Sequence, residues 1–298
     1  MRREGVSSVQ GALPQQAQTG DLEEAMRRPT ARTMQANHLK PPIALTIAGS
    51  DSGGGAGLQA DLRAFMAFQV HGCSAITCVT AQNTCGVERV DALPPEGLKA
   101  QFHAVQKDLA IDAVKTGMLL NIELIKATAA MLEPLTIPKV IDPVMVSRTG
   151  AVLLEEQAIQ ALRHELLPQA TLLTPNRHEA RLLSGLALDD ASSVEKAAAV
   201  IHAQGPAAVL IKSGSDPAHG GRDLLFDGTA QWLGGDWVDT PHSHGTGCTL
   251  SAAITACLAR GDTLTNAIDK ARNYVKQGLR QSLAIGHGQG PICHWTIQ

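Results

Sequence analysis

From Ile43 onward, short apolar runs alternate with longer segments whose apolar residues recur at helical spacing. Each short run has the length and composition of a buried β-strand, and each longer segment is typical of a helix. This alternation is the pattern of βαβ units, so it predicts an α/β fold with a mainly parallel sheet and helices on both faces. The predicted strands are Ile43–Ala48, Ala75–Thr80, Ala113–Thr116, Val140–Ile141, Thr171–Thr174 and Ala207–Lys212.

The last part of the predicted domain has a different pattern. Leu224–Phe226 and Ala230–Leu233 are separated by Asp227-Gly228-Thr229, a turn sequence that predicts a β-hairpin. Two helices are expected after it, over residues 247–260 and 264–283.

The first forty residues lack a regular apolar period. They are rich in Gln, Arg and Glu and end at Lys40-Pro41-Pro42, so we expect residues 1–40 to be a flexible extension and residues 41–298 to be a single domain. Glu4 and Asp21 are out of place in an organelle transit peptide, and Met34 offers an alternative start.

Composition narrows the classes of function. The 298 residues are 44% hydrophobic and 3% aromatic, with a formal net charge of −3. This balance gives no electrostatic reason to expect a nucleic acid or a membrane surface as partner. The six cysteines form no Cys-x-x-Cys pair, and no apolar stretch is long enough to span a membrane. We therefore expect a cytoplasmic protein with reduced thiols.

A first glycine loop, Gly49–Gly57, follows the first strand and precedes an apolar helical stripe. Glycines let the backbone turn sharply and approach a ligand, although they also occur in simple tight turns. No Lys follows as a Walker A loop requires. Gly55-x-Gly57-x-x-Ala60 fits the loose dinucleotide pattern, but the acidic residue expected after the second strand is missing, which weakens an NAD-dependent oxidoreductase reading.

A second glycine loop leads from His242 through Gly245-Thr246-Gly247-Cys248 into an apolar helix. The N–H groups of a first helical turn bind phosphate oxygens, so the loop predicts an anion site. Cys248 would lie at the helix start, where the local field lowers a thiol pKa and prepares a general base. The alternatives are a small packing residue and, with His242 and His244, an incomplete zinc site.

These loops, together with other segments, resemble the hydroxymethylpyrimidine/phosphomethylpyrimidine kinase family. The resemblance extends in order through most of the chain. The segments that carry it are Ala44–Asp51, Gln59–Asp61, Gln82–Gly86, Lys115–Met118, Asp142–Met145, Thr174–Asn176 and His244–Ala253.

The resemblance implies a ribokinase-like three-layer α/β/α fold and assigns a role to individual residues. The pyrimidine pocket would be lined by Gly49, Ala56, Asp61, Gln82, Met118 and Val144, with Gln82 and Asp61 supplying hydrogen bonds. Asp142, Asn176 and Glu179 would hold Mg²⁺, while Lys212, Asn176 and Thr246 would face ATP. Gly245, Thr246 and Gly247 would stabilise the transferring phosphoryl group, and Cys248 would accept the substrate proton.

The activity implied is transfer from ATP, with Mg²⁺, to 4-amino-5-hydroxymethyl-2-methylpyrimidine and then to its monophosphate, giving the diphosphate used in thiamine biosynthesis. A homodimer is expected from the resemblance alone. Ser147–Gly150 and Ser213–Ser215 depart from the family's usual residues. A pyridoxal kinase of the same fold, which usually has an acidic residue at the position of Cys248, and a catalytically silent pyrimidine sensor remain as alternatives.

Overall fold

Among the described residues of the domain from Pro41 onward, a nine-stranded sheet has the strand order β3-β2-β1-β4-β5-β6-β7-β8-β9. The computed structural model describes residues 40–145, 154, 156–212, 220–235 and 237–295. The strands are β1 (Ile43–Asp51), β2 (His71–Gln82), β3 (Val87–Ala92), β4 (Ala113–Thr116), β5 (Lys139–Ile141), β6 (Leu172–Leu173), β7 (Val209–Ile211), β8 (Asp223–Phe226) and β9 (Ala230–Leu233).

Strands β2, β1, β4, β5, β6 and β7 are parallel, whereas β3, β8 and β9 are antiparallel to their neighbours. Because parallel strands end at one edge of a sheet, the loops that follow them gather there. The sheet thus brings loops from distant parts of the sequence together.

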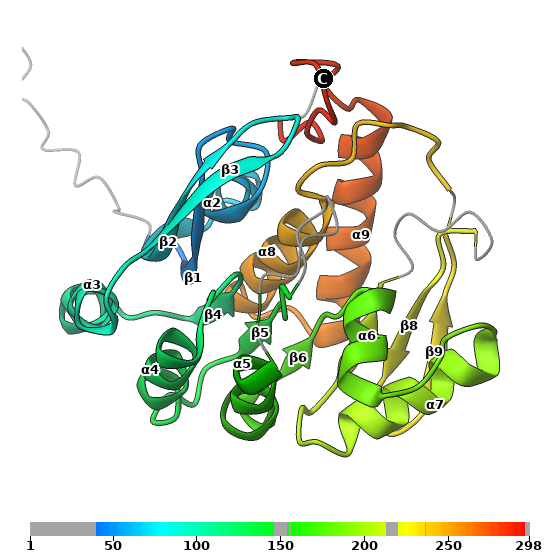
Figure 1. The fold of residues 1–298 in the computed structure, drawn as a ribbon, viewed down its shortest axis with the longest axis horizontal. Helices are drawn as coiled ribbons and strands as arrows, with labels where there is room; N and C mark the ends of the chain where they lie inside the picture. The colour runs from blue at the N-terminus through cyan, green and yellow to red at the C-terminus, as the bar shows by residue number, and fades with distance from the viewer. Residues whose placement is uncertain (1–39, 146–153, 155, 213–219, 236, 296–298) are drawn as a thin grey trace, which may run out of the picture. The chain divides into compact units, whose positions relative to one another are not determined.

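Helices cover both faces of this sheet (Figure 1). One layer packs around α2 (Gly57–Ala67), α8 (Thr246–Ala259) and α9 (Leu264–Arg280). The other contains α3 (Pro95–Asp108), α4 (Ile122–Leu132), α5 (Glu156–Ala161), α6 (Arg177–Ser184) and α7 (Ala191–His202), with a π-helical turn at Leu162–Leu166 and a 3₁₀ turn at Leu167–Gln169 after α5. Within the described residues, no helix combines the length and apolar character needed to cross a membrane.

Alternation of side chains along the strands separates the two layers. In β1, Ile43, Leu45 and Ile47 belong to the core beneath α3 and α4, while Ala44 packs with Phe65 of α2. Successive strand residues point to opposite faces, so an all-apolar strand is buried on both sides. The continuous apolar character of Ile43–Ala48 follows from this arrangement.

The predicted α/β class and the hairpin of β8 and β9 are confirmed. Two details differ. Strand β1 continues to Asp51 instead of ending before Gly49, because Ser50 and Asp51 still pair with Val79 and Thr80 of β2. Strand β3 was not predicted, because it is an edge strand without a buried residue and has no strong apolar pattern.

Part of the sequence interpretation lies outside the described residues. This applies to the flexible extension over residues 1–39, to the unusual Ser147–Gly150 and to Ser213–Ser215.

Candidate active site

An open cavity of about 1370 Å³ lies where the parallel strands end. Its wall includes residues from the loops after β1, β4, β5 and β7 and from the start of α8. All but one of the predicted site residues line it. These are Gly49, Ala56, Gln82, Met118, Asp142, Val144, Asn176, Glu179, Lys212, Gly245, Thr246, Gly247 and Cys248. The exception is Asp61.

Gly49, Met118 and Gln82 form one side of the cavity. A Cβ atom on Gly49 would lie 2.8 Å from Met118 Cε, so the missing side chain makes room for the methionine. Gln82 ends β2, and its amide oxygen accepts a hydrogen bond from Thr80 Oγ1 over 3.2 Å. An apolar wall with one amide suits a small heteroaromatic ring.

Asp51 holds the first glycine loop in shape. Its carboxylate accepts hydrogen bonds from the backbone N–H groups of Gly53 (2.8 Å), Gly55 (3.0 Å) and Ala56 (2.8 Å). Burial acts to raise the pKa of Asp51, but hydrogen bonds from His244 and from the loop outweigh it and keep the pKa below its usual value. The sequence analysis treated Asp51 only as part of the loop and missed this role.

His244 joins the two glycine loops. Its Nε2 atom lies 3.0 Å from Asp51 Oδ2 and 3.3 Å from the Gln82 amide nitrogen. The backbones are also in direct contact, because a Cβ atom on Gly245 would lie only 1.8 Å from the carbonyl oxygen of Gly55. The substrate side and the phosphate side of the cavity therefore share one hydrogen-bonded junction.

Helix α8 begins in this junction. Gly245 is its N-cap with a φ of 81°, a left-handed conformation that favours glycine. The first turn of a helix has N–H groups without partners in the helix, and these attract anions. Thr246, Gly247 and Cys248 form that turn and line the cavity.

The expectation that the helix start lowers the Cys248 pKa is wrong for the protein without substrates. Burial raises the pKa of the Cys248 thiol to about 11, although the charge of Lys115 and the N–H of Gly57 act in the opposite direction. The desolvation of a partly buried thiolate exceeds the effect of the helix dipole. Cys248 is thus a thiol at neutral pH before ligands bind.

Asp61 lies behind the cavity wall, in contact with Lys115, which lines the cavity. Its side chain is 0% exposed, and its Oδ2 atom accepts hydrogen bonds from Lys115 Nζ (3.0 Å) and Thr46 Oγ1 (2.6 Å). Its Oδ1 atom has no hydrogen-bond partner among the described residues, and the hydrogen bond between Asp61 and a pyrimidine stays a prediction. Burial acts to lower the pKa of Lys115, but the charge of Asp61, with the charge of Asp142 and the hydrogen bond to Asp61, acts against it, and the Lys115 pKa is raised.

A second buried pair, Lys212 and Asp142, also lies near Cys248. Lys212 Nζ is 2.8 Å from Asp142 Oδ1, and Asp142 Oδ2 accepts a hydrogen bond from Ser251 of α8 over 3.1 Å. A Cβ atom on Gly247 would lie 3.3 Å from Lys212 Nζ, which places the ammonium group beside the first turn of α8. This positive charge and the helix N-terminus can bind the same anion.

Asn176 and Glu179 form a capping box at the start of α6. The Asn176 side chain accepts a hydrogen bond from the Glu179 N–H, and the Glu179 carboxylate accepts one from the Asn176 N–H. Glu179 is buried, and burial raises its pKa to about 7, while Lys212 lowers it and Asp142 raises it. Both residues therefore cap a helix and also line the cavity.

The donor set fits a magnesium ion that retains water molecules. Among the described residues, no group of three or more His, Cys, Asp and Glu side chains could by itself hold a metal ion. Mg²⁺ needs only one or two carboxylates when substrate phosphates and water complete its shell. The charge of Asp142 acts to raise the Glu179 pKa, and a divalent cation held by these carboxylates would relieve that repulsion.

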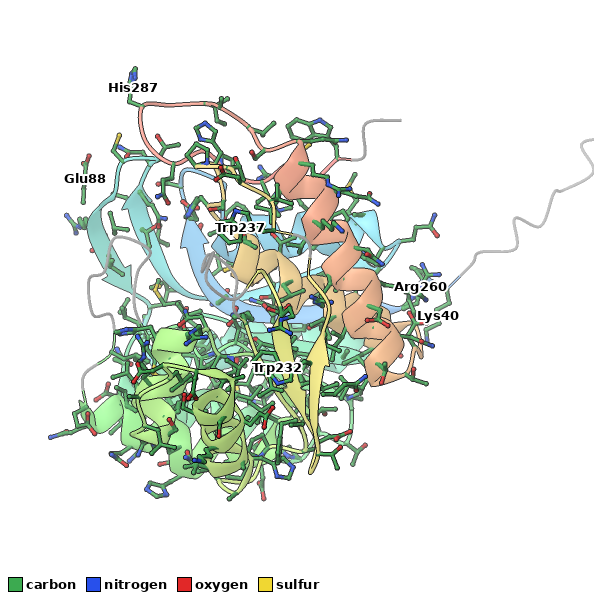
Figure 2. The ribbon with its side chains drawn as sticks, turned by 90° about the vertical axis from the view of Figure 1, so that its right-hand side faces the viewer. Lys40, Glu88, Trp232, Trp237, Arg260 and His287 are labelled. Atoms are coloured by element: carbon green, nitrogen blue, oxygen red, sulfur yellow. The ribbon has the colours of Figure 1, made fainter. Side chains whose placement is uncertain are left out.

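The rim also contains residues that the sequence analysis missed. Gln289 N–H donates to the carbonyl oxygen of Thr84, and the Gly288 N–H donates to Thr84 Oγ1. Thr84, Gly288 and Gln289 all line the cavity. Figure 2 shows His287 at the outer turn of the segment after α9, and Trp237, which also lines the cavity, after β9.

The sequence pattern of the phosphomethylpyrimidine kinase family matches residues 51–293. The chain belongs to this family. A hydroxymethylpyrimidine/phosphomethylpyrimidine kinase from Synechococcus elongatus is 54% identical over 268 residues, which cover 85% of this chain and 97% of the relative. Proteins of the phosphomethylpyrimidine kinase family are phosphotransferases, so the chain is an enzyme of that class.

Solved structures of similar proteins include two kinds of kinase. A Bacillus subtilis pyridoxal kinase in complex with ADP is 37% identical, with a TM-score of 0.79 over 85% of this chain and 97% of the other. A phosphomethylpyrimidine kinase from Clostridium difficile is also 37% identical, with a TM-score of 0.70 over 78% of this chain and 97% of the other. These similarities confirm the ribokinase-like fold of the phosphomethylpyrimidine kinase family in this chain.

Proposed function

We propose that the chain transfers the γ-phosphoryl group of ATP to 4-amino-5-hydroxymethyl-2-methylpyrimidine and then to the resulting monophosphate, in thiamine biosynthesis. The observation that carries this proposal is one cavity in which Gln82 and Met118 face the same space as Lys212 and Cys248. The family membership adds the substrate class, because several relatives are named for both activities.

The pyrimidine is proposed to bind against Met118 and Val144, with its polar edge at the Gln82 amide. An amide offers both a donor and an acceptor, as does the edge of an aminopyrimidine. His244 and Thr80 contact the amide and limit its rotation. This arrangement would direct the hydroxymethyl group toward the start of α8.

The phosphate end is proposed to act by neutralising charge. Lys212 and the N–H groups of Gly245, Thr246 and Gly247 would bind the oxygens of the γ-phosphoryl group as negative charge spreads over them. A magnesium ion held by Asp142, Asn176 and Glu179 would neutralise further phosphate charge when bound.

Cys248 is proposed as the base for the first transfer only. As a thiolate it would take the proton of the hydroxymethyl O–H while that oxygen bonds to the γ-phosphorus and the bond to ADP breaks. In the second transfer the acceptor is a phosphate oxygen that is already ionised, so no proton has to be removed. The two transfers therefore depend differently on the thiol.

An ATP-consumption assay with Mg²⁺ tests the substrate. The purified full-length protein is offered the hydroxymethylpyrimidine, its monophosphate or pyridoxal in parallel, and products are identified by mass. We expect both pyrimidines to yield the diphosphate. Failure of both pyrimidines to react would contradict the proposal, and an absence of any product would favour the silent sensor.

Pyridoxal phosphorylation is the second candidate. The similarity to the ADP-bound Bacillus subtilis pyridoxal kinase favours it, and Cys248 at the start of α8 argues for the pyrimidine instead. A kcat/KM for pyridoxal above that for the hydroxymethylpyrimidine would reverse the order of the two candidates.

We also propose a cytoplasmic homodimer that requires Mg²⁺. The scattered cysteines and the family resemblance support the compartment and the assembly, and the Asp142–Glu179 donor set supports the ion. Sedimentation equilibrium would test the dimer, and activity after treatment with a chelator would test the ion.

A further inference from the structure

Two buried lysine–aspartate pairs lie near Cys248. The pair of Lys212 and Asp142 belongs to the phosphate end of the cavity. The pair of Lys115 and Asp61 has no role in the reaction proposed above. Both side chains are 0% exposed, and Lys115 Nζ lies 3.0 Å from Asp61 Oδ2. A buried ion pair costs desolvation energy and is weak evidence of stabilisation by itself, so its position calls for an explanation.

The sheet and helix α2 fix the position of Lys115. Thr46 of β1 and Lys115 of β4 are register partners on adjacent parallel strands, so their side chains share one face of the sheet. Asp61 of α2 packs onto that face and accepts a hydrogen bond from each of them. The Lys115 ammonium group is therefore held by Asp61, whose carboxylate is fixed in turn by Thr46.

Despite its burial, Lys115 forms part of the cavity wall together with Gly117 and Cys248. A Cβ atom on Gly117 would lie 3.1 Å from Lys115 Nζ, so a side chain there would crowd the ammonium group. Helix α2 also lies near the thiol, because the N–H of its first residue, Gly57, acts to lower the Cys248 pKa. Helix α2 thus contains both Asp61, the partner of the lysine, and a backbone group that acts on the thiol.

We propose that Lys115, held by Asp61, is a positioning residue for the first phosphoryl transfer, in which its ammonium group stabilises the Cys248 thiolate that accepts the substrate proton. This inference rests on the proposed role of Cys248 as base. In the step, the substrate O–H bond breaks, an S–H bond forms at Cys248, and the freed oxygen bonds to phosphorus as ADP leaves. The thiol then returns its proton to water.

The charges around the thiol agree with this role. Burial raises the pKa of Cys248, and Lys115 is the strongest influence in the opposite direction. Asp61 and Asp142 raise the thiol pKa, while Lys212 faces the thiol from the loop after β7. Without Lys115, the two carboxylates would act on the thiol with one positive charge fewer to oppose them.

The test measures the alkylation of Cys248 by iodoacetamide in the full-length protein without substrates. Only the thiolate reacts, so the rate against pH reports its stability, and peptide mass separates Cys248 from the exposed Cys85. We expect Lys115→Met to slow alkylation at about pH 8 by roughly tenfold or more, which corresponds to one pKa unit. Lys139→Met is the matched control, because Lys139 is a buried lysine on β5 that does not line the cavity. Cys248 in this variant should be alkylated at the same rate as in the wild type.

A second variant covers the case in which Lys115→Met does not fold because Asp61 is left unpaired. Asp61→Asn combined with Lys115→Met removes both charges of the pair. Lys115 influences the thiol more than Asp61 does, so alkylation should still slow, by about threefold. An unchanged pH profile in a folded variant of either kind would overturn the proposal.

The transfer steps complete the test. Lys115→Met should slow phosphorylation of the hydroxymethylpyrimidine more than phosphorylation of its monophosphate. Equal loss in both steps would overturn the role in the first transfer even if alkylation slows. Alkylation needs no substrate, so an incorrect assignment of the enzyme's substrate would leave that result intact and would be recognised separately.

Discussion

At the scale of single residues, the site depends on buried charges that are matched in pairs. Asp142 is balanced by Lys212, and Asp51 is surrounded by three backbone N–H groups and His244. Removing one member of a buried pair leaves an uncompensated charge, which typically costs about 3–5 kcal/mol. Variants at these positions therefore change stability as well as catalysis, and both have to be measured.

Replacement of Cys248 by Ala should impair the first transfer by about 10²-fold or more, the usual contribution of a general base. The second transfer should fall much less, because its acceptor has no proton to remove. Single-turnover rates with the hydroxymethylpyrimidine and with its monophosphate would measure the difference.

The matched control is Cys257→Ala. Cys257 is buried in the same helix but does not line the cavity. The Cys257→Ala variant should leave the ratio of the first-transfer rate to the second-transfer rate unchanged. Equal losses in both steps with Cys248→Ala would count against the base assignment.

His294 should make the protein sensitive to acid. It is buried and lies 2.9 Å from Thr249 Oγ1, and burial together with the charge of Arg63 lowers its pKa to about 4. Unfolding restores the usual pKa near 6.5, so the unfolded chain binds the proton more readily. The stability that the neutral imidazole confers is fully present above about pH 6.5 and is lost as the pH falls toward 4.

His294→Gln should reduce this acid sensitivity. Between about pH 7 and pH 4.5 the variant should lose less free energy of unfolding than the wild type, by up to about 3 kcal/mol. Urea unfolding at several pH values would measure it. If the free energy of unfolding depended on pH in the same way in both proteins, His294 would be excluded as the source of the acid sensitivity.

At the scale of elements, helix starts build the site. Helices α2, α6 and α8 each begin at the cavity, and each begins in a different way. Helix α6 has the capping box of Asn176 and Glu179, while α8 begins at Gly245 with no capping side chain. The Thr246 N–H donates to the Ser243 carbonyl oxygen, and because no side chain caps α8, the N–H groups that follow in its first turn can face a phosphate.

Gly245→Ala should abolish phosphoryl transfer and lower stability. A Cβ atom there would occupy the position of the Gly55 carbonyl oxygen, in addition to the strain of a φ of 81°. We expect the free energy of unfolding to fall by more than about 2 kcal/mol. Activity and chemical denaturation of the same preparation would measure both effects.

Gly261→Ala separates backbone strain from contact. Gly261 follows the other end of α8 with a φ of 84°, and nothing lies within 4 Å of the position of its Cβ. The Gly261→Ala variant should lose about 1 kcal/mol of free energy of unfolding and retain full activity. Similar activity losses in the two variants would show that the contact between Gly245 and Gly55 is not the cause of the activity loss in Gly245→Ala.

Much of the arrangement of elements could be predicted because it depends on local patterns. The apolar runs, the glycine loops and the Asp227-Gly228-Thr229 turn each identified an element that the structure contains. Strand β3 could not be predicted, since an exposed edge strand is determined by its pairing with β2 and not by its own apolar residues.

The site could be predicted only in part, for a related reason. The resemblance named residues that line the cavity, but it could not show that Asp61 points toward Lys115, because that depends on how α2 packs onto β1 and β4. A signal for Lys115 was present: a lysine within the buried run Ala113–Thr116 requires a buried partner. The raised Cys248 pKa depends on tertiary burial, which a helix-start argument does not include.

At the scale of the whole molecule, one sheet connects all three clusters of buried apolar side chains. Val140 and Ile141 are neighbours in β5, yet they belong to clusters on opposite faces. A layer cannot unfold without exposing the sheet to which the other layer is packed. We therefore expect the described domain to unfold in a single transition.

Nucleotide binding should raise the midpoint of that transition. The ATP analogue AMP-PCP, at about a hundred times its Kd, should add about 2.7 kcal/mol to the free energy of unfolding. Differential scanning calorimetry would measure the shift. Lys212→Met should remove most of it relative to that variant's own midpoint.

The control is Lys270→Met. Lys270 is an exposed lysine of α9 that pairs with Asp262 outside the cavity. This variant should keep the full shift with AMP-PCP. A full shift with Lys212→Met would contradict the assignment of Lys212 to the phosphates.

The segment after α9 has a consequence for how the enzyme is made. It adds the bridge between His244 and Pro291 and the contacts of Gly288 and Gln289 with Thr84. During translation, β1, β2 and both glycine loops leave the ribosome before these residues do. A nascent chain can therefore complete its sheet while the rim of its cavity is still unfinished, and ligand capture becomes one of the final events of its maturation.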